Sequence, residues 1–551
     1  MNGLLRILPL GGVGEIGKNM TVFEYGDEIV IIDCGLMFPE EEMFGVDFVV
    51  PDVTYLKDRR HMVKAFLITH AHEDHVGGLP YILPNFPQVP IYASTLARGL
   101  LGNKIKEHKL NDNPLLPFDP GDTVAMGAFS ATAFRIGHSI PDAMGIALQT
   151  PVGLVVHTGD FKFDYTPVDG KMSDLHALAE FGRRGVICLM SDSTRAESPG
   201  YTPSERVVGE VFRDIMEGLE GRIIVATFAS NIARIQQVFD AAGTFKRRVA
   251  VIGRSMEQNV RIASDLGYLN FPDSQLVQKD RLRDVPDAQL VIATTGAQGE
   301  PMAGLARMAN RDHRWVEIQP GDTVIVSASP IPGNEEVVGR TIDNLFKAGA
   351  NVFYHDIKRA HVSGHASQEE LKLMLNLTQP RHFIPIHGEF RMLIQHGRLA
   401  QELGVSAQSI FIIENGQPIE ISADGSARRG APVEAGYVYV DGLSVGEVGD
   451  VILRDRRALA SDGMFLVVVT VDKQSGTVIG RPEIVTHGFV AGPDDPVIAA
   501  AADRVSAAIE NPGDHTTEVA LLKAQIKDSL TQYLYERTRR RPMVFPVVVE
   551  V

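Results

Sequence analysis

Short apolar runs that end in polar or glycine-containing turns recur along the N-terminal part of the chain. Examples are residues 65–68 (Ala-Phe-Leu-Ile), 133–137 and 153–159. Runs of this length, bounded by turn residues, are typical of buried strands. Residues 21–25 and 28–33 flank a Gly-Asp pair, which predicts a hairpin with a two-residue turn. We therefore expect this part of the chain to be rich in strands.

The pattern changes between residues 202 and 350, where strand-like and helix-like segments alternate. Apolar runs predict strands at 222–226, 248–252, 290–294 and 323–328, and periodic segments predict helices at 232–241, 258–266 and 335–347. Such alternation is typical of a parallel sheet covered by helices. We expect a separate α/β layer here.

The C-terminal part of the chain predicts a further small unit. Residues 425–449 are rich in glycine and valine without strong periodicity, so we expect a linker that packs on the core. Beyond residue 464 the pattern predicts strands at 465–471 and 543–551 and helices at 496–509 and 517–538.

The densest group of potential ligands is the run Thr-His-Ala-His-Glu-Asp-His at residues 69–75. His70, His72, Asp74 and His75 form an H-x-H-x-D-H pattern on a loop between a predicted strand and a predicted helix. Imidazole and carboxylate groups together suit zinc or manganese. A lone histidine is usually structural, but four ligand types so close together are not typical of a solvated loop. The run therefore predicts metal binding.

One cluster cannot complete two metal sites, so further ligands are expected at other strand ends. His138, Asp160 and His387 each directly follow an apolar run. Each alone is weak support, because polar residues commonly end strands. Together with the first cluster they predict a dinuclear centre. Because residues 202–350 hold none of these ligands while His387 follows them, we expect that layer to be inserted into the metal-binding domain, with a substrate cleft between the two.

Further motifs connect this pattern to a known family. Residues 189–194 (Leu-Met-Ser-Asp-Ser-Thr), 361–366 (His-Val-Ser-Gly-His-Ala) and 385–389 (Pro-Ile-His-Gly-Glu) resemble the motifs of the nucleic-acid-processing β-CASP group of the metallo-β-lactamase superfamily. With residues 10–19 and the C-terminal region included, nearly the whole chain resembles the bacterial ribonuclease J family.

The resemblance implies an α/β fold: an αββα metallo-β-lactamase sandwich with an inserted α/β β-CASP domain and a small C-terminal α/β domain. The implied boundaries are 1–201 and 351–430 for the split sandwich, 202–350 for the insertion, 431–463 for a linker and 464–551 for the C-terminal domain. In this family the C-terminal domain supports self-assembly, so a homodimer or homotetramer is implied.

The resemblance also implies roles for single residues. The first metal is assigned to His70, His72 and His138, the second to Asp74, His75 and His387, and Asp160 bridges both. His365 is implied as the general acid for the leaving 3′-oxygen, oriented by Asp192, and Asp74 joins this catalytic set; on sequence alone His365 is equally well a structural histidine. Two divalent metals, Zn²⁺ or Mn²⁺, would lower the pKa of bound water to roughly 7 and neutralise charge on a phosphodiester.

A phosphate pocket follows from the same resemblance. Ser230 and Asn231 lie between a predicted strand and a predicted helix, and His361, Ser363, Gly364 and His365 form a second turn. In the family these turns hold the 5′-monophosphate and neighbouring backbone of RNA. The implied function is a 5′-to-3′ exonuclease that prefers 5′-monophosphate RNA, with endonuclease activity, in RNA decay and rRNA and mRNA maturation. From the residues alone, an ordinary helix cap is the favoured reading of the first turn.

Two further features have competing interpretations. Residues 12–17 fit the G-x-G-x-x-G pattern of dinucleotide sites, but the hairpin that follows leaves no room for the required helix. We interpret these glycines as a tight turn beside the active site and Asp33 as a support for the ligands. Some family members carry a structural calcium site that would map to Asp47 and Asp441, although surface aspartates are the default interpretation.

Three other functions fit the motifs less well than an RNA nuclease. A DNA nuclease of the related cross-link-repair group usually carries Val in the third motif, which His387 argues against. A small-molecule metallo-hydrolase, such as a lactamase or thioesterase, would not need the long insertion or the Ser-Gly-His motif. A non-catalytic scaffold would have lost ligands, and all seven are present here.

Composition and charge indicate which partners and which cell compartment to expect. The chain has 551 residues and a net charge of −16, so a nucleic-acid partner requires local basic patches or metal charge. Cys34 and Cys188 lie in or beside apolar strands, which suggests a reducing compartment. No signal-peptide pattern and no long apolar run are present, so we expect a cytoplasmic protein without a membrane span. Single-stranded RNA and RNA-degradation proteins are the implied partners.

Overall fold

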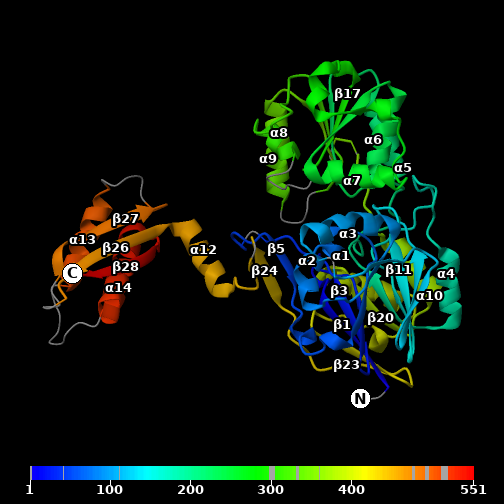
Figure 1. The fold of residues 1–551 in the computed structure, drawn as a ribbon, viewed down its shortest axis with the longest axis horizontal. Coiled ribbons are helices and arrows are strands. Elements are labelled where there is room, and N and C mark those ends of the chain that lie inside the picture. The colour runs from blue at the N-terminus through cyan, green and yellow to red at the C-terminus, as the bar shows by residue number, and fades with distance from the viewer. Residues whose placement is uncertain are drawn as a thin grey trace. The chain divides into compact units, whose positions relative to one another are not determined.

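The computed structural model describes residues 3–40, 42–110, 112–296, 304–329, 334–355, 357–358, 360–442, 444–473, 478–489, 495–509 and 519–551. The chain divides into two compact units. The first comprises Met1–Phe38 and Phe48–Val438, and the second comprises Pro39–Asp47 and Tyr439–Val551. The ribbon of each unit can be followed by colour in Figure 1.

Two packed sheets form the sandwich of the first unit. The first sheet has the order β23-β22-β1-β3-β4-β6-β7-β8 and the second has the order β20-β13-β12-β11-β10-β9. The first consists of β1 (Leu4–Gly11), β3 (Met20–Tyr25), β4 (Glu28–Ile32), β6 (Val63–Leu67), β7 (Ile91–Ala93), β8 (Leu115–Pro117), β22 (Ile419–Ser422) and β23 (Ala427–Arg429). The second consists of β9 (Thr123–Met126), β10 (Phe129–Arg135), β11 (Met144–Thr150), β12 (Gly153–His157), β13 (Val186–Asp192) and β20 (His382–Ile386).

Both faces of the second sheet are buried. Ile146 on β11 belongs to the core between the sheets, together with Phe23 on β3. The next residue along the strand, Ala147, belongs to a core on the other face, together with Phe181 and Leu371. These two come from α4 (Leu175–Arg184) and α10 (Gln368–Thr378). Burial on both faces explains why these strands are continuous apolar runs in the sequence rather than alternating ones.

Parallel pairing places the functional loops at common sheet edges. In the second sheet β12 pairs in parallel with β13, and β13 pairs in parallel with β20. In the first sheet β4 and β6 are parallel neighbours. Since the carboxyl ends of parallel strands meet at one edge, the turns that follow these five strands converge. This convergence positions the site.

The segment inserted after β13 folds as a parallel α/β layer with the order β16-β15-β17-β14-β18-β19. Its strands are β14 (Ile223–Ala226), β15 (Arg248–Ile252), β16 (Leu276–Val277), β17 (Leu290–Thr294), β18 (Thr323–Val326) and β19 (Asn351–Phe353). Its helices are α5 (Arg206–Met216), α6 (Ile232–Thr244), α7 (Arg254–Asp265), α8 (Gly304–Ala309) and α9 (Glu335–Lys347). Helices α8 and α9 pack on one face of the sheet and α5 to α7 on the other (Figure 1).

The second unit contains a three-stranded sheet and two long helices. The sheet order is β27-β26-β28, from β26 (Met464–Val471), β27 (Val478–His487) and β28 (Met543–Glu550), and α13 (Pro496–Ile509) and α14 (Val519–Thr538) contribute to its core. Residues 517 and 518 of the expected second helix lie outside the described residues. The sequence pattern did not predict β27, because Gly480 and Pro482 interrupt its apolar positions.

The stretch expected as a linker, residues 431–463, contains β24 (Tyr437–Asp441) and the helix α12 (Asp450–Asp462). Leu453 is the one side chain of α12 that is buried among the described residues, so the helix lacks the apolar stripe that reveals helices in a sequence. Among the described helices, none combines the length and apolarity required to cross a bilayer.

Candidate metal centre

The histidine-rich run begins on a loop and ends in a helix. It follows β6, and α1 (Glu73–Val76) starts inside it, whereas the sequence predicted that a helix would begin after the run. His72 is the N-cap residue, and Glu73 and Asp74 occupy the first turn, where acidic side chains favour a helix start. Loop and helical turn together aim the ligands of this run at one point.

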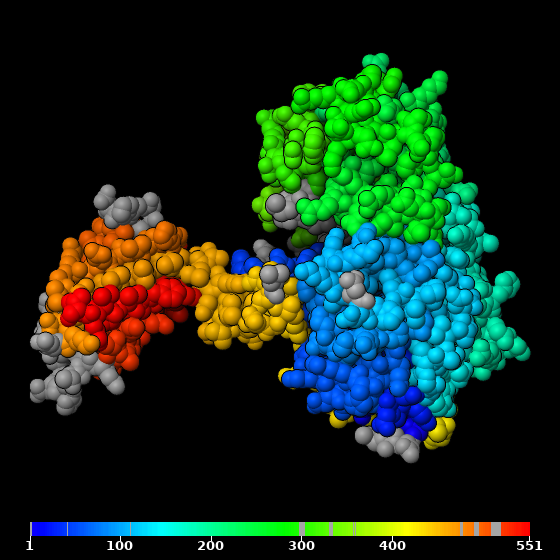
Figure 2. Space-filling model, viewed as in Figure 1, coloured from blue at the N-terminus to red at the C-terminus, as the bar shows by residue number. Residues whose placement is uncertain are grey.

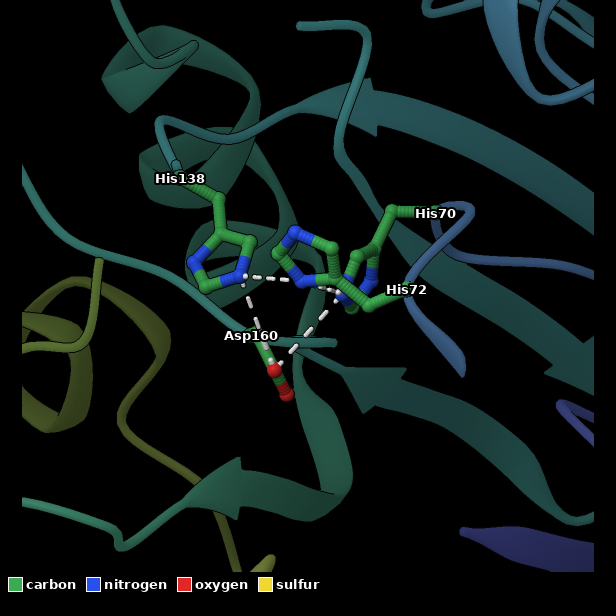
Figure 3. Close-up of side chains that lie close together, drawn as sticks. All are labelled: His70, His72, His138 and Asp160. Carbon is green, nitrogen blue, oxygen red and sulfur yellow. Dashed lines mark hydrogen bonds and ion pairs between the residues drawn. The ribbon is translucent and has the colours of Figure 1, made fainter. Parts of the chain in front are cut away.

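Three imidazoles form the first candidate ligand group. His72 Nδ1 lies 3.1 Å from His70 Nε2 and 3.1 Å from His138 Nε2. Asp160 Oδ2 lies 3.6 Å from His70 Nε2 and 3.7 Å from His138 Nε2. Figure 3 shows these side chains converging. Tetrahedral zinc with Zn–N bonds of about 2.05 Å separates its ligand atoms by roughly 3.3 Å, so this spacing fits one ion.

A second group shares Asp160 with the first. Asp160 Oδ2 is 3.2 Å from His75 Nε2 and 3.4 Å from His387 Nε2. Asp74 Oδ2 is 3.2 Å from His387 Nε2 and 3.6 Å from His75 Nε2. The other carboxylate oxygen of Asp160, Oδ1, is buried and has no hydrogen-bond partner among the described residues. A buried carboxylate oxygen without a donor fits a cation ligand.

Hydrogen bonds at the far ring nitrogens orient the imidazoles. His138 Nδ1 donates to the carbonyl of Gly364 (2.9 Å), and His75 Nδ1 donates to Asp33 Oδ2 (2.8 Å). His387 Nδ1 lies 2.8 Å from the hydroxyl of Thr194. Each contact leaves Nε2 facing the centre, which is the arrangement that fixes the tautomer of a metal-binding histidine.

Asp33 therefore supports the ligands, as the sequence suggested. It also accepts hydrogen bonds from the backbone N–H and the hydroxyl of Thr69, both at 2.8 Å. The loop at residues 12–17 borders the centre as well, because the N–H of His387 donates to the carbonyl of Gly12 at 2.7 Å. His387 has a φ of 51°, and this backbone contact helps to hold the residue in that left-handed conformation.

The charge state differs between the two groups. Burial lowers the pKa of His72 to about 4 and also lowers the pKa of His70 and His138, which keeps these imidazoles neutral, as metal ligands must be. Around His387 burial also disfavours the charged form, but Asp160 and Asp74 outweigh it and raise its pKa to about 9. The negative charge of these carboxylates can be balanced either by a proton on His387 or by a metal cation.

His365 and Asp192 form a pair beside the second group. His365 Nδ1 donates to Asp192 Oδ2 at 2.8 Å, and Asp192 Oδ1 accepts from the N–H of Thr194 at 2.9 Å. The side chain of His365 is 21% exposed, whereas that of Asp192 is 1% exposed. Burial disfavours the imidazolium of His365, but Asp192 outweighs this effect and raises the pKa of His365. The histidine can therefore carry a proton toward solvent or substrate.

The two candidate phosphate turns come close to each other. The ring centroids of Phe228 and His361 are 6.4 Å apart, and Ser230 and Asn231 follow Phe228 closely along the chain. Asn231 is the N-cap of α6, and its Oδ1 accepts from the N–H of Arg234 at 3.0 Å. The cap that the sequence favoured is thus present. Asn231 Nδ2 is buried without a partner in the described part of the chain, so both N–H groups of this amide are free to donate.

The calcium interpretation gains no support from the geometry. Asp47 Oδ2 accepts from the N–H of Gly442 at 2.7 Å, and Asp441 is ion-paired with Arg456. A guanidinium already neutralises one of the two carboxylates that would have to bind the ion.

Sequence reasoning did not find several supporting residues. Thr194 contacts His387, and Asn19 Nδ2 donates to the carbonyl of Asp74 at 3.0 Å. The buried cations Lys162 and Arg234 contact the turn at residues 361–365. These contacts join segments that are far apart in the chain, so spacing carries no signal for them. The sequence signal for Lys162 and Arg234 is that each is a charged residue within an otherwise apolar stretch.

We expect Gly364→Ala to damage the first ligand group. A Cβ at this position would lie 2.7 Å from His138 Cε1 and 2.9 Å from Ser139 Oγ, so the imidazole must move. Loss of this supporting geometry should lower metal affinity about 10- to 100-fold, measured by competition with a fluorescent chelator. Gly339→Ala, where nothing lies within 4 Å, is the matched control and should bind metal as the parent does. Equal affinity in both variants would contradict this arrangement.

Four family models match consecutive parts of the chain. They are "Metallo-beta-lactamase superfamily" (residues 13–185), "Ribonuclease J, beta-CASP domain" (220–345), "Zn-dependent metallo-hydrolase RNA specificity domain" (352–411) and "Ribonuclease J C-terminal domain" (451–551). A metallo-β-lactamase domain with an inserted β-CASP domain and a C-terminal domain is therefore the architecture of this chain.

Curated relatives match nearly end to end. The chain is 42% identical to "Ribonuclease J2" of Bacillus subtilis, with 99% of each chain covered. It is 44% identical to "Ribonuclease J" of Thermus thermophilus, covering 99% of this chain and 95% of the relative. A solved structure, "Crystal Structure of a Protein of Unknown Function from Enterococcus faecalis V583", has a TM-score of 0.53 at 16% identity and covers 76% of this chain and 100% of its own, which shows a shared fold. The full-length matches and the domain models together place this chain in the ribonuclease J family.

Proposed function

We propose that the chain is a metal-dependent ribonuclease that degrades single-stranded RNA from its 5′ end, prefers a 5′-monophosphate and also cleaves internally. The observation that carries this proposal is Asp160, whose Oδ2 faces two ligand groups while Oδ1 is buried without a partner among the described residues. The relatives named ribonuclease J and the RNA-specificity domain support RNA as the substrate.

Two divalent ions, Zn²⁺ or Mn²⁺, would be held by the two groups and would supply an activated water and neutralise phosphodiester charge. His70, His72 and His138 would hold one ion, Asp74, His75 and His387 the other, and Asp160 would be shared. Within the chain, His365 would give a proton to the leaving 3′-oxygen, and Asp192 would fix its tautomer through the 2.8 Å hydrogen bond.

The 5′-monophosphate would bind between the two turns described above. Ser230 and Asn231 offer a hydroxyl, an amide and the N-terminus of α6, which favours anions. His361, Ser363, Gly364 and His365 form the facing turn, and Gly364 contacts the ligand His138 directly. A phosphate held there would place the first phosphodiester of the RNA near the metal groups.

Self-assembly through the C-terminal domain is part of the proposal. Along the edge strand β28, Phe545, Val547 and Val549 are 40%, 38% and 41% exposed. Figure 2 shows this strand, in red, on the surface of the second unit. An exposed apolar edge strand favours pairing with another chain, which supports a homodimer or homotetramer. We also propose that the protein acts in the cytoplasm, in RNA decay and in the maturation of rRNA and mRNA. Other RNA-degradation proteins are its proposed partners.

We expect Ser230→Ala to weaken 5′-end selection. A hydrogen bond to a charged group contributes about 1.5–3 kcal/mol, so the ratio of kcat/KM for 5′-monophosphate over 5′-hydroxyl RNA should fall about 10- to 100-fold. Ser274→Ala, at an exposed position of the same inserted domain, should keep the parental ratio. A ratio that falls equally in both variants, or in neither, would refute this pocket. Cleavage of single-stranded DNA in place of RNA would move the protein to the repair nucleases.

A further inference from the structure

The turn at residues 362–365 is held by its carbonyl groups. Four consecutive carbonyls accept hydrogen bonds from four different side chains: Val362 from Arg234 (3.2 Å), Ser363 from Lys162 (3.2 Å), Gly364 from His138 (2.9 Å) and His365 from Thr202 (2.7 Å). The donors come from the inserted domain, from the sandwich and from the segment that joins them. We call this set of contacts the carbonyl clamp.

Arg234 is the part of the clamp that reaches across domains. It lies on α6, is fully buried and forms a bidentate pair with Glu205, with both N···O distances at 2.8 Å. The same guanidinium donates to the carbonyl of Ser327 at 2.8 Å and to His361 Nδ1 at 2.6 Å. Because Nδ1 accepts, His361 carries its proton on Nε2. Arg234 therefore holds both His361, through its ring, and Val362, through its carbonyl.

Lys162 supplies the second buried cation. Its side chain is 2% exposed, and Nζ donates to the carbonyl of Pro203 at 3.1 Å as well as to Ser363. Asp164 lies 3.9 Å away. Lys162 follows Asp160 by two residues, so the clamp and the shared metal ligand belong to one short segment.

Holding the carbonyls fixes the direction of the N–H groups. Across a trans peptide the C=O of one residue and the N–H of the next point in opposite directions. With the carbonyls of Val362 and Ser363 directed into the clamp, the N–H groups of Ser363 and Gly364 point away from it. Successive N–H groups with a common direction form an anion-binding concavity. Burying a cation has a cost in desolvation free energy. In return, a buried cation with fixed partners holds the carbonyls of this turn in one geometry.

We propose that Arg234 and Lys162 are positioning residues, which aim the N–H groups of Ser363 and Gly364 at an RNA phosphate without touching it. This inference rests on the proposed function, because the phosphate is that of the 5′ end. It also makes the phosphate pocket depend on contact between the two domains, since Arg234 belongs to the inserted layer and Lys162 to the sandwich.

The test separates pocket geometry from metal chemistry. Arg234→Met, Arg234→Lys and Lys162→Met are compared on 5′-monophosphate RNA, on 5′-hydroxyl RNA and on bis(p-nitrophenyl) phosphate, which uses the metals but no 5′ pocket. We expect the monophosphate preference to fall about 10- to 100-fold in Arg234→Met and Lys162→Met, while hydrolysis of the small diester stays within about threefold. Arg234→Lys should not restore the preference, because an ammonium cannot reproduce the guanidinium fork.

Arg247→Met is the matched control, since Arg247 is a buried arginine of the same domain that donates to the carbonyl of Gly221 instead of the turn. It should lose thermal stability yet keep the preference. A preference that survives in Arg234→Met, or an equal loss on all three substrates, would overturn the clamp alone. A parent enzyme without 5′ preference would overturn the proposed function and the clamp together. If Arg234→Met does not fold, Arg234→Lys and Lys162→Met decide the matter.

Discussion

Replacing Asp160 by Asn is expected to lower RNA hydrolysis by at least about 1,000-fold and to reduce the amount of bound metal. The variant keeps the size of the side chain but removes the negative charge that both ligand groups share. Asp160 Oδ2 lies 3.2 to 3.7 Å from the ring nitrogens of four histidines, which places it between the two groups. Metal content by mass spectrometry and single-turnover rates measure the two effects.

His176→Ala is the control for Asp160→Asn. His176 is exposed on α4 and belongs to neither ligand group. It should bind the parental amount of metal and cleave RNA at the parental rate. An Asp160→Asn enzyme that retains both ions and more than about a tenth of the activity would show that the shared carboxylate is not essential.

Replacing His365 by Ala should lower kcat for RNA by about 100- to 10,000-fold and leave metal content unchanged. A proton supplied by His365 would matter only when the leaving group is a poor one. Hydrolysis of bis(p-nitrophenyl) phosphate, whose leaving group needs no proton, should therefore remain close to the parental rate. Asp192→Asn should reduce RNA cleavage in the same way, because the amide removes the carboxylate that charges and orients the imidazole.

The small diester also separates two roles of His365. His365, Asp192, Asp160 and His387 have ligand atoms close enough to hold an ion. If His365→Ala loses metal and slows on both substrates alike, His365 is a ligand and the general-acid assignment is wrong. The Nδ1 contact with Asp192 at 2.8 Å leaves Nε2 free and fits either role, so metal content and the small diester decide between them.

The residues of the two candidate groups could be predicted to lie together from the sequence, because they are tied to strand ends. Asp160 and His387 follow apolar runs that are buried on both faces of one sheet, and the parallel neighbours of that sheet bring their carboxyl ends together. A polar residue after such a run is visible without a structure. The inserted layer was visible for the same reason, and its helix α9 spans the residues expected for it.

The supporting contacts could not be read in this way. Arg234 and Val362 are 128 residues apart and Lys162 and Ser363 are 201 apart, so no periodicity or motif relates them. The helix α12 was also missed, because its buried surface is too small to impose an apolar stripe. Tertiary context, rather than local propensity, decides these features.

The most direct measurement of the central claim is a time course of cleavage of one body-labelled RNA that carries a 5′-monophosphate, a 5′-triphosphate or a 5′-hydroxyl end. A matched single-stranded DNA is run beside it. Each reaction is carried out with Mn²⁺, with Mg²⁺ and with a chelator. A metal-dependent release of mononucleotides, fastest from the monophosphate RNA and absent in His72→Ala, is the predicted result. Absence of RNA cleavage under every metal condition, or cleavage that persists in chelator and in His72→Ala, would contradict a metal-dependent 5′ ribonuclease.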